Sequence, residues 1–250
     1  GVSGVIEPCD ASDTQAKPCY DYKGLSRSRV FLEKLSNALR ATGIDVYQID
    51  HEDANGQFEM NYTYTDCLTS CDHYIFFKMA ASEIANELGL ICSFMPKPFA
   101  DQSGSGMHIH TSLDVGGENA FASSAHAPNE LMAKWLAGQV EHARSMTLLG
   151  SPTPNGLKRI RPYTFAPTHI HWGLDNRTVL ARCIAEPGST ANRIEYRHAG
   201  ADANPHVIIA ALLAAGADGI ERGLTPPPMS VGDMYSNPGD CVAVPVDVDD

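Results

Sequence analysis

The sequence has few basic residues for its size. Its 250 residues include 18 Lys and Arg against 30 Asp and Glu, so the formal net charge is −12 at pH 7. A protein that binds nucleic acid or an anionic membrane needs a basic face for the phosphate groups. The charge balance therefore argues against both kinds of partner.

Long apolar runs are also missing. No segment approaches the roughly 18 consecutive apolar residues that a membrane-spanning helix needs. The composition, with 43% hydrophobic and 19% charged residues, is that of an ordinary globular protein. The length fits one large domain or two small ones, with enough chain to bury a core.

A disulfide pattern is absent as well. The seven cysteines are an odd number and include no C-x-x-C pair, which predicts reduced thiols and a cytoplasmic protein. The chain begins Gly-Val-Ser-Gly, without Met and without an apolar signal segment. We therefore expect it to be part of a longer protein.

The basic residues that are present concentrate in one stretch. Residues 158–197 hold seven of the 18, with only three acids among them. Because the guanidinium group matches carboxylate and phosphate, this density predicts a site for a small anion. A solvated charged face is the alternative. The seven are Lys158, Arg159, Arg161, Arg177, Arg182, Arg193 and Arg197.

Hydrophobic periodicity and turn residues predict a mixed α+β fold with an antiparallel sheet. The helix over 66–89 is expected to bury Ile75, Phe76, Met79, Ile84 and Leu88. The Pro-rich, acidic tail 223–250 shows no pattern and is expected to be poorly ordered. The other helices are expected over 27–42, 129–149 and 205–221, and strands over 44–50, 58–64, 90–95, 107–113, 168–174, 178–184 and 192–198.

One hairpin is predicted to bring two carboxylates together. Asn55-Gly56 favours a two-residue type I′ turn, and counting outward from it places Glu52 opposite Glu59. Directly opposed side chains lie ~4.5–5.5 Å apart at Cβ, so a divalent cation would relieve their repulsion. Hard oxygen ligands indicate Mg²⁺ or Mn²⁺. A solvent-exposed hairpin end, where water screens the repulsion, is the alternative.

A second pattern follows a glycine-rich turn. In the run Gly104–Ser112, alternation places His108, His110 and Ser112 on one face of a strand. An imidazole can ligate a metal and a hydroxyl can bind phosphate. A lone H-x-H is weak evidence, and the second one, His169 and His171, is predicted to be structural.

The third pattern alternates charge along one strand. Arg193, Glu195 and Arg197 share a face, which is either a salt-bridge ladder or an anion cradle whose Glu holds a metal. Glu, His and Arg spread over separate strands favour phosphoryl chemistry. No Walker loop, kinase glycine loop or dinucleotide fingerprint is present.

Taken in order along residues 17–222, these motifs resemble the catalytic domain of glutamine synthetases, nearest to the type III and γ-glutamylmethylamide synthetase branch. The resemblance implies a curved antiparallel sheet with flanking helices over 1–222, followed by the tail 223–250. It rests on Asn55–Glu59, Phe94–Pro98, Gly104–Ser112, Asn155–Arg159, Asp175–Arg177, Arg193–Arg197 and Ala203–Pro205.

That resemblance implies an ATP-dependent ligase that joins ammonia or a small amine to glutamate through γ-glutamyl phosphate. It also implies a homo-oligomer with active sites between subunits. By matching position, two Mg²⁺ or Mn²⁺ ions would be held by Glu52, Glu59, His108 and Glu195. Glutamate would be bound by Gly104, Arg159 and Arg197, ATP by His110, Ser112, Arg182 and Arg193, and the transferring phosphoryl group by Arg177.

The sequence also departs from that family. Phe165 stands where most members carry a Glu that helps to capture and deprotonate ammonium; a phenyl ring cannot act as a base, so a methylated or larger amine becomes an alternative substrate. Ser103 stands where many members have Asn. The E-x-E strand and the N-terminal β-grasp domain of the family are absent, so we expect this fragment alone to be inactive. A non-catalytic relative and another two-metal phosphoryl-transfer enzyme remain as further alternatives.

Overall fold

The computed structural model of the protein describes residues 6–247, which form two compact units. Unit 1 comprises Gly1–Phe94 and Pro98–Gly104, and unit 2 comprises Met95–Lys97 and Ser105–Asp250. Most of unit 1 thus precedes the glycine-rich turn, and unit 2 holds the arginine-rich stretch. Within the described residues, no helix combines the length and apolar character that a membrane crossing requires.

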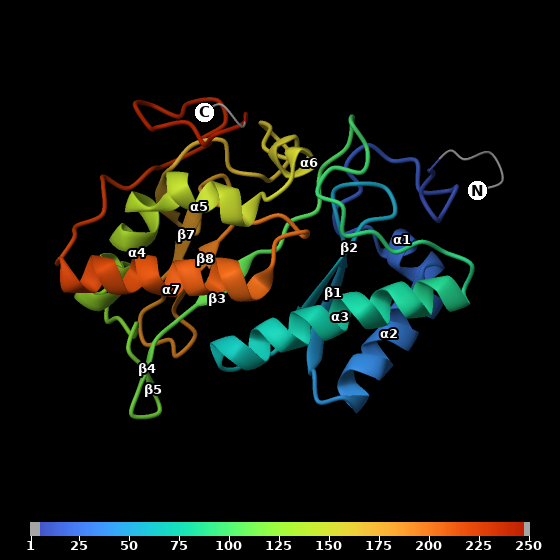
Figure 1. The fold of residues 1–250 in the computed structure, drawn as a ribbon, viewed down its shortest axis with the longest axis horizontal. Coiled ribbons are helices and arrows are strands. Elements are labelled where there is room, and N and C mark those ends of the chain that lie inside the picture. Colours follow the sequence, from blue (N-terminus) through green and yellow to red (C-terminus); the bar gives the residue numbers. More distant parts are fainter. Residues whose placement is uncertain (1–5, 248–250) are drawn as a thin grey trace. The chain divides into compact units, whose positions relative to one another are not determined.

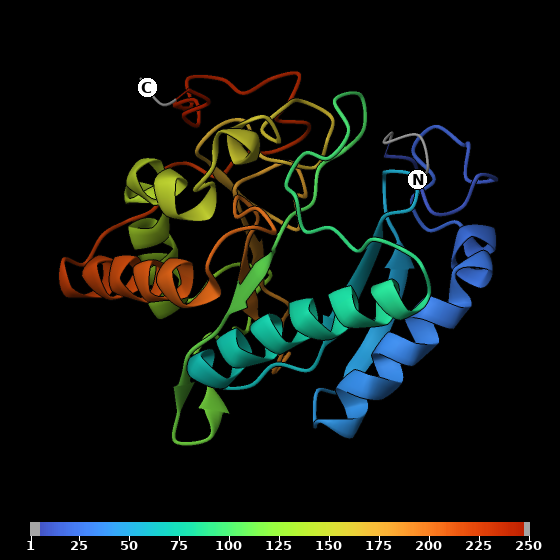
Figure 2. The same ribbon diagram turned by 45° about the vertical axis from the view of Figure 1, so that its right-hand side comes forward.

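Unit 1 consists of a β-hairpin and three helices. Helices α1 (Tyr22–Arg27) and α2 (Arg29–Ala41) precede strands β1 (Val46–His51) and β2 (Phe58–Tyr62), and α3 (Cys67–Glu87) follows. Figures 1 and 2 show α2 in blue and α3 in teal beside the hairpin. Their shared core contains Leu35, Leu39, Ile44, Val46 and Ala81.

The buried side of α3 differs from the prediction. Small residues, Cys71, Ala81 and Ala85, are the buried ones. The larger side chains are more exposed: Ile75 and Phe76 are each 39% exposed, and Met79 is 61% exposed. α3 therefore packs in unit 1 through these small residues together with the half-buried Phe77 and Ile84, which lie against the shared core.

The hairpin register also differs from the prediction, by two residues. Asp50 lies opposite Glu59, and Glu52 closes the ladder by donating its N–H to the Gln57 carbonyl at 2.8 Å. Gly56 has φ 68°, but Asn55 is not among the described residues with positive φ. A type I′ turn needs both, so the connection is a four-residue loop, 53–56. A shift of two residues leaves every side chain on the face of the hairpin that was predicted. Glu52 and Glu59 therefore still share a face, but as diagonal neighbours.

Distant side chains explain this wider loop. The Asp13 carboxylate accepts the Gly56 N–H at 2.6 Å and the Asn55 side-chain amide at 3.1 Å. Gln102 Oε1 accepts the Asn55 N–H at 2.8 Å. These acceptors satisfy the backbone N–H groups of Asn55 and Gly56 and the Asn55 side-chain amide, which a two-residue turn would have left to solvent.

Unit 2 contains a four-stranded sheet in the order β3-β8-β7-β6. The mixture of helices and strands confirms the predicted α+β class. Strands β3, β8 and β7 are antiparallel neighbours as expected. The prediction is wrong for the outermost pair, because β6 runs parallel to β7. The strands are β3 (Ile109–Thr111), β6 (Trp172–Leu174), β7 (Ala181–Ile184) and β8 (Arg193–Tyr196).

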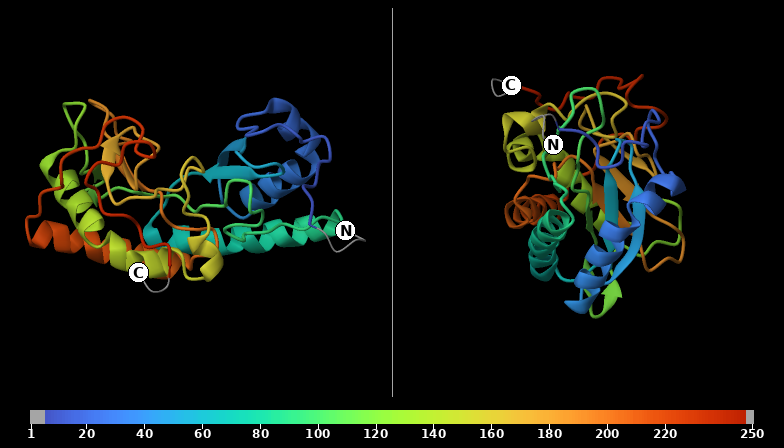
Figure 3. Two further views of the ribbon diagram at one scale, coloured as in Figure 1. Left: turned by 90° about the horizontal axis from the view of Figure 1, so that it is seen from above. Right: turned by 90° about the vertical axis from the view of Figure 1, so that its right-hand side faces the viewer.

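Two helices pack tightly on one side of this sheet, α4 (Glu130–Glu141) and α7 (Pro205–Glu221) (Figure 3). A Cβ added at Gly138 would lie 1.9 Å from the Ala215 carbonyl oxygen, and one at Gly219 would lie 2.2 Å from that of Lys134. Glycine at these positions therefore permits the close contact of the two backbones.

Several elements of the two units differ from the prediction. The helix predicted over 129–149 is two helices, because the chain bends at His142 between α4 and α5 (Ala143–Gly150). The strand predicted over 90–95 is not formed. The elements that periodicity did not indicate are α1, α6 (Pro154–Leu157), β4 (Asp114–Val115) and β5 (Glu118–Asn119).

The C-terminal segment 223–247 has no helix or strand but makes specific contacts with unit 2. The Ser230 N–H donates to the Trp172 carbonyl at 2.9 Å, and the Trp172 indole donates to the Pro227 carbonyl at 2.7 Å. The Val244 N–H reaches the Thr168 carbonyl at 2.9 Å, and the Val244 side chain is buried. These hydrogen bonds hold the segment against the edge strand β6 and against Thr168, which precedes it.

Candidate active site

A row of polar residues crosses three strands of the unit 2 sheet. His110 on β3 lies opposite Glu195 on β8, and Arg182 on β7 lies opposite the same glutamate. Directly opposed residues share a face of the sheet. The predicted alternation therefore brings together an imidazole, a carboxylate and a guanidinium from segments far apart in the sequence.

Glu195 is the hub of this face. Its Oε1 lies 2.5 Å from Arg197 Nη1 and 3.3 Å from His108 Nδ1, while Oε2 accepts from Arg182 Nη1 at 3.1 Å. The carboxyl group is almost fully buried. Burial alone would raise its pKa, but the hydrogen bond from His108 and the charge of Arg197 hold the pKa well below its usual range. Glu195 is therefore a carboxylate at neutral pH.

His108 is neutral at the same pH. Burial and the nearby Arg197 lower its pKa to about 4, against the opposing effect of Glu195. With Nδ1 toward the carboxylate, the proton belongs on that nitrogen and Nε2 carries a lone pair. A neutral imidazole oriented by a carboxylate is the usual form of a histidine metal ligand.

Two buried arginines stand beside this hub. Arg159 donates from Nη1 to the His198 carbonyl at 2.9 Å and from Nη2 to the Arg197 carbonyl at 3.2 Å. Burial and the charge of Arg197 lower the pKa of Arg159 to about 10. The Nε atoms of Arg159 and Arg197 are buried without a hydrogen-bond partner among the described residues. An anion beside them would supply the missing acceptor and offset the paired positive charge.

Gly106 makes room for one of these guanidinium groups. A Cβ at this position would lie 2.5 Å from Arg159 Nη2 and 3.3 Å from His108 Nε2. The glycine-rich turn therefore leaves space for the Arg159 side chain.

The other predicted residues of unit 2 lie at varied distances from the hub. Arg193 donates from Nε to His110 Nδ1 at 3.0 Å. The side chains of Ser112 and Arg177 are exposed. Phe165 has φ 58°, is 41% exposed, and accepts from Arg197 Nη2 through its carbonyl at 3.4 Å.

Unit 1 carries the predicted carboxylate pair. Burial, followed by repulsion from Glu59, raises the pKa of Glu52 to about 7. Glu59 accepts from the Asn61 side chain at 2.9 Å. Gly104 belongs to the same unit, where its carbonyl accepts from the Gln57 side chain at 3.1 Å. A desolvated carboxylate next to a second one is a suitable donor set for a hard divalent cation.

The sequence patterns missed the groups that support this hairpin. His51 is fully buried, with Nε2 2.9 Å from Asp13 Oδ2 and Nδ1 2.9 Å from the Glu52 carbonyl oxygen. Ser103 donates to the Asp53 carboxylate. Asp13 lies in a stretch for which no helix or strand was predicted, and no spacing rule would have paired it with residues about 40 positions later.

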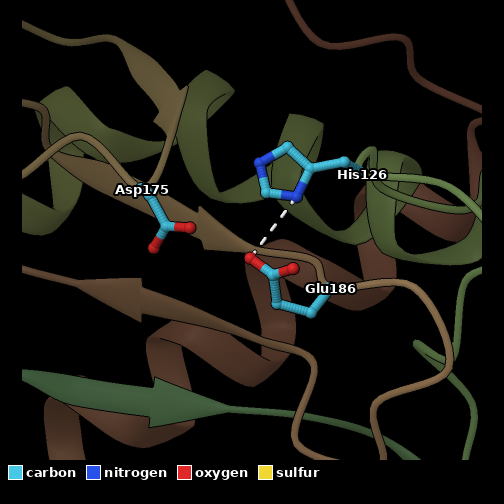
Figure 4. Close-up of side chains that lie close together, drawn as sticks. All are labelled: His126, Asp175 and Glu186. Carbon is cyan, nitrogen blue, oxygen red and sulfur yellow. Dashed lines mark ion pairs between the residues drawn. The ribbon is translucent and has the colours of Figure 1, made fainter.

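A separate group of possible metal ligands lies on the surface of unit 2. His126, Asp175 and Glu186 offer ligand atoms that all lie within 4.8 Å of one another, and all three residues are exposed (Figure 4). His126 Nδ1 is 3.4 Å from Glu186 Oε1. Asp175 already accepts from Arg182 at 2.8 Å. Exposed acidic groups of this kind are common without an ion, and we assign no ligand to them.

Comparison with known proteins matches residues 4–249 to the family model for the glutamine synthetase catalytic domain. A glutamate–methylamine ligase of Methyloversatilis universalis is 52% identical over 235 residues, covering 90% of this chain and 52% of that protein. A Thermus thermophilus glutamine synthetase is 37% identical over 86% of this chain and 49% of its own length. The chain thus spans about half the length of these relatives.

Solved structures agree with the sequence matches. A GmaS/ADP complex superposes with a TM-score of 0.88 at 36% identity, covering 96% of this chain and 57% of the solved one. GmaS without ligand gives a TM-score of 0.87 at 37% identity, covering 96% of this chain and 56% of that chain.

Proposed function

Since the chain belongs to the glutamine synthetase catalytic-domain family, we propose that the full-length protein is an ATP-dependent ligase that joins a small amine to the γ-carboxylate of glutamate. The observation that carries the proposal is the buried pair Arg159 and Arg197, each with an unpartnered Nε. Two guanidinium groups in one buried site call for an anionic substrate group, and a carboxylate matches their planar donors.

The other predicted site residues of unit 2 suit phosphoryl transfer. We assign ATP contacts to His110, Ser112, Arg182 and Arg193, and we assign Arg177 to the transferring phosphoryl group. Positive charge from several arginines would offset the negative charge that builds up between nucleotide and acceptor oxygen. Arg182 fits this role, because its buried Nε has no partner among the described residues.

The donor sets fit divalent metal ions. The neutral imidazole of His108 and the ionised Glu195 would hold one Mg²⁺ or Mn²⁺, and the carboxylates of Glu52 and Glu59 would hold another. When bound, such ions neutralise phosphate charge and polarise the transferring group.

Methylamine or a similar alkylamine is the amine that we favour over ammonia. Phe165 offers an aromatic face rather than a carboxylate base, and an alkylammonium ion is attracted both to the ring face and to the apolar surface. The 52% identical relative is a glutamate–methylamine ligase, and a 39% identical one from Pseudomonas is a glutamate–isopropylamine ligase. Both names support an amine larger than ammonia.

ADP release by the full-length protein tests the proposal. We expect release that requires both L-glutamate and an amine, with a γ-glutamyl amide identified by mass spectrometry as the product. Release that ignores glutamate would contradict the ligase assignment. No release with any amine, from a correctly assembled protein, would favour the non-catalytic relative.

Two further assignments complete the proposal. The full-length protein would act as a homo-oligomer whose active sites lie between subunits, and it would work in the cytoplasm. All seven cysteines are free thiols in the structure, which agrees with a reducing compartment.

A further inference from the structure

The C-terminal segment holds one tyrosine in a fixed position on unit 2. The Met234 N–H donates to Thr178 Oγ1 at 3.1 Å, and the Met234 side chain is buried. Next along the chain, the Tyr235 N–H donates to Asp233 Oδ1 at 2.9 Å, and Asn237 N–H closes the turn on the Asp233 carbonyl at 3.1 Å. The backbone of Tyr235 is therefore held from both sides.

The ring of Tyr235 packs against a residue from the arginine-rich stretch. Its centroid lies 5.3 Å from that of Tyr163, with an angle of 54° between the rings. Tyr163 and Phe165 both have positive φ, 59° and 58°, and Phe165 is bonded through its carbonyl to Arg197. This contact brings the C-terminal segment to the neighbourhood of the paired arginines.

The hydroxyl group of Tyr235 is buried and has no hydrogen-bond partner among the described residues. The positive charges of Arg197 and Arg159 both act on it and lower its pKa, while burial has the larger effect and raises the pKa to about 12. The hydroxyl therefore keeps its proton at neutral pH and lies within the field of both guanidinium groups. A buried O–H without an acceptor is costly, which points to a ligand that supplies one.

We propose that Tyr235 is a substrate-binding residue whose hydroxyl donates to a carboxylate of the amino-acid substrate, beside Arg159 and Arg197. The inference rests on the proposed function and adds to it a contact from the C-terminal segment. A carboxylate fits because it accepts several hydrogen bonds at once, from two charged donors and one neutral donor. The neutral O–H adds direction without adding to the repulsion between the two arginines.

Tyr235→Phe in the full-length protein tests this contact, because it removes one oxygen and keeps the ring that packs on Tyr163. We expect KM for L-glutamate to rise about ten- to a hundred-fold, the range for a hydrogen bond to a charged group. KM for ATP and kcat should stay within about threefold. Tyr64→Phe is the matched control, because Tyr64 is 88% exposed in unit 1, and its kinetics should equal those of the wild type.

A binding measurement guards against an effect of folding alone. L-Glutamate should raise the melting temperature of the wild type, and Tyr235→Phe should need about ten times more glutamate for the same rise. An unchanged glutamate KM in Tyr235→Phe would overturn the inference, as would a fall in kcat with KM unaltered. Absence of glutamate-dependent ADP release in the wild type would instead refute the proposed function, so the two failures are distinguishable.

Discussion

Arg159 Nη2 donates to the backbone carbonyl of Arg197 at 3.2 Å, so the guanidinium group of one buried arginine is hydrogen-bonded to the backbone of the other. Burial and the positive charge of Arg197 both lower the pKa of Arg159, so each charge makes the other less favourable. The structure tolerates this arrangement through hydrogen bonds to carbonyls and to Glu195. The repulsion that remains is what a bound carboxylate would relieve.

Arg159→Lys should weaken glutamate binding. Lysine keeps the charge but loses the planar fork and the bonds to the His198 and Arg197 carbonyls. We expect KM for glutamate in the full-length protein to rise about ten- to a hundred-fold, corresponding to about 1.4–2.7 kcal/mol. Steady-state kinetics with saturating ATP and amine measures it. Arg161→Lys, an exposed neighbour, is the control, and equal effects of the two substitutions would refute the role of Arg159.

Phe165→Glu should change the choice of amine. The carboxylate would supply a base and a charge partner for ammonium, and it would remove the aromatic face. We expect kcat/KM for methylamine to fall and that for ammonium to rise, so that their ratio drops at least about tenfold. Phe165→Leu keeps an apolar side chain and should leave the ratio closer to that of the wild type. An unchanged ratio in Phe165→Glu would exclude Phe165 from the amine site.

Glu52→Gln should increase the free energy of unfolding at neutral pH while weakening metal binding. The raised pKa of Glu52, about 7, means that the folded state holds its proton more tightly than the unfolded state. Stability from this group is therefore present below pH 4.5 and lost as the pH rises toward 7. With divalent ions removed, the variant should gain stability relative to the wild type between pH 5 and pH 8, measured by urea unfolding.

The same variant should bind Mn²⁺ at least about tenfold more weakly, since it loses a proposed ligand. Glu87→Gln, on the exposed end of α3, serves as control for both measurements. Tighter Mn²⁺ binding by Glu52→Gln, or the same binding as the wild type, would remove Glu52 from the metal site.

His171 should make the protein sensitive to acid. Its side chain is 2% exposed, and Nδ1 accepts the Leu180 N–H at 3.4 Å. Burial lowers its pKa to about 4, so its contribution is complete above pH 6.5 and is lost as the pH falls toward 4. At pH 5 the loss amounts to about 2 kcal/mol at most.

Urea unfolding between pH 7 and pH 5 measures this effect. His171→Asn keeps an acceptor for the Leu180 N–H and should reduce the pH dependence by the share of His171, about 2 kcal/mol at most, whereas His206→Asn at the start of α7 should leave it unchanged. A wild-type slope in His171→Asn would show that other groups cause the acid sensitivity.

Parts of the fold could be read from the sequence because they depend on local pattern. The helices predicted over 27–42, 66–89 and 205–221 correspond to α2, α3 and α7. The apolar run 90–95 was misread as a strand, because a short apolar run has no period that distinguishes strand from coil. α1, with six residues, is too short to show a period at all.

The site was predictable where alternation along one strand sufficed, as for Arg193, Glu195 and Arg197. The register of the β1–β2 hairpin was not predictable, because Asp13 and Gln102 bind its loop from distant positions in the sequence. The buried contacts of Arg159, and the approach of Tyr235 to Tyr163, are likewise long-range. Such contacts follow from the packing of whole elements and leave no spacing in the sequence.

The most direct test of the account compares two amines in one assay. The ratio of kcat/KM for methylamine to kcat/KM for ammonium is measured for the full-length protein with saturating ATP, Mg²⁺ and L-glutamate. A glutamate–alkylamine ligase predicts a ratio above about 10, since one methyl group in an apolar site contributes about 1–3 kcal/mol. A ratio below 1 would contradict the account and identify ammonia as the substrate.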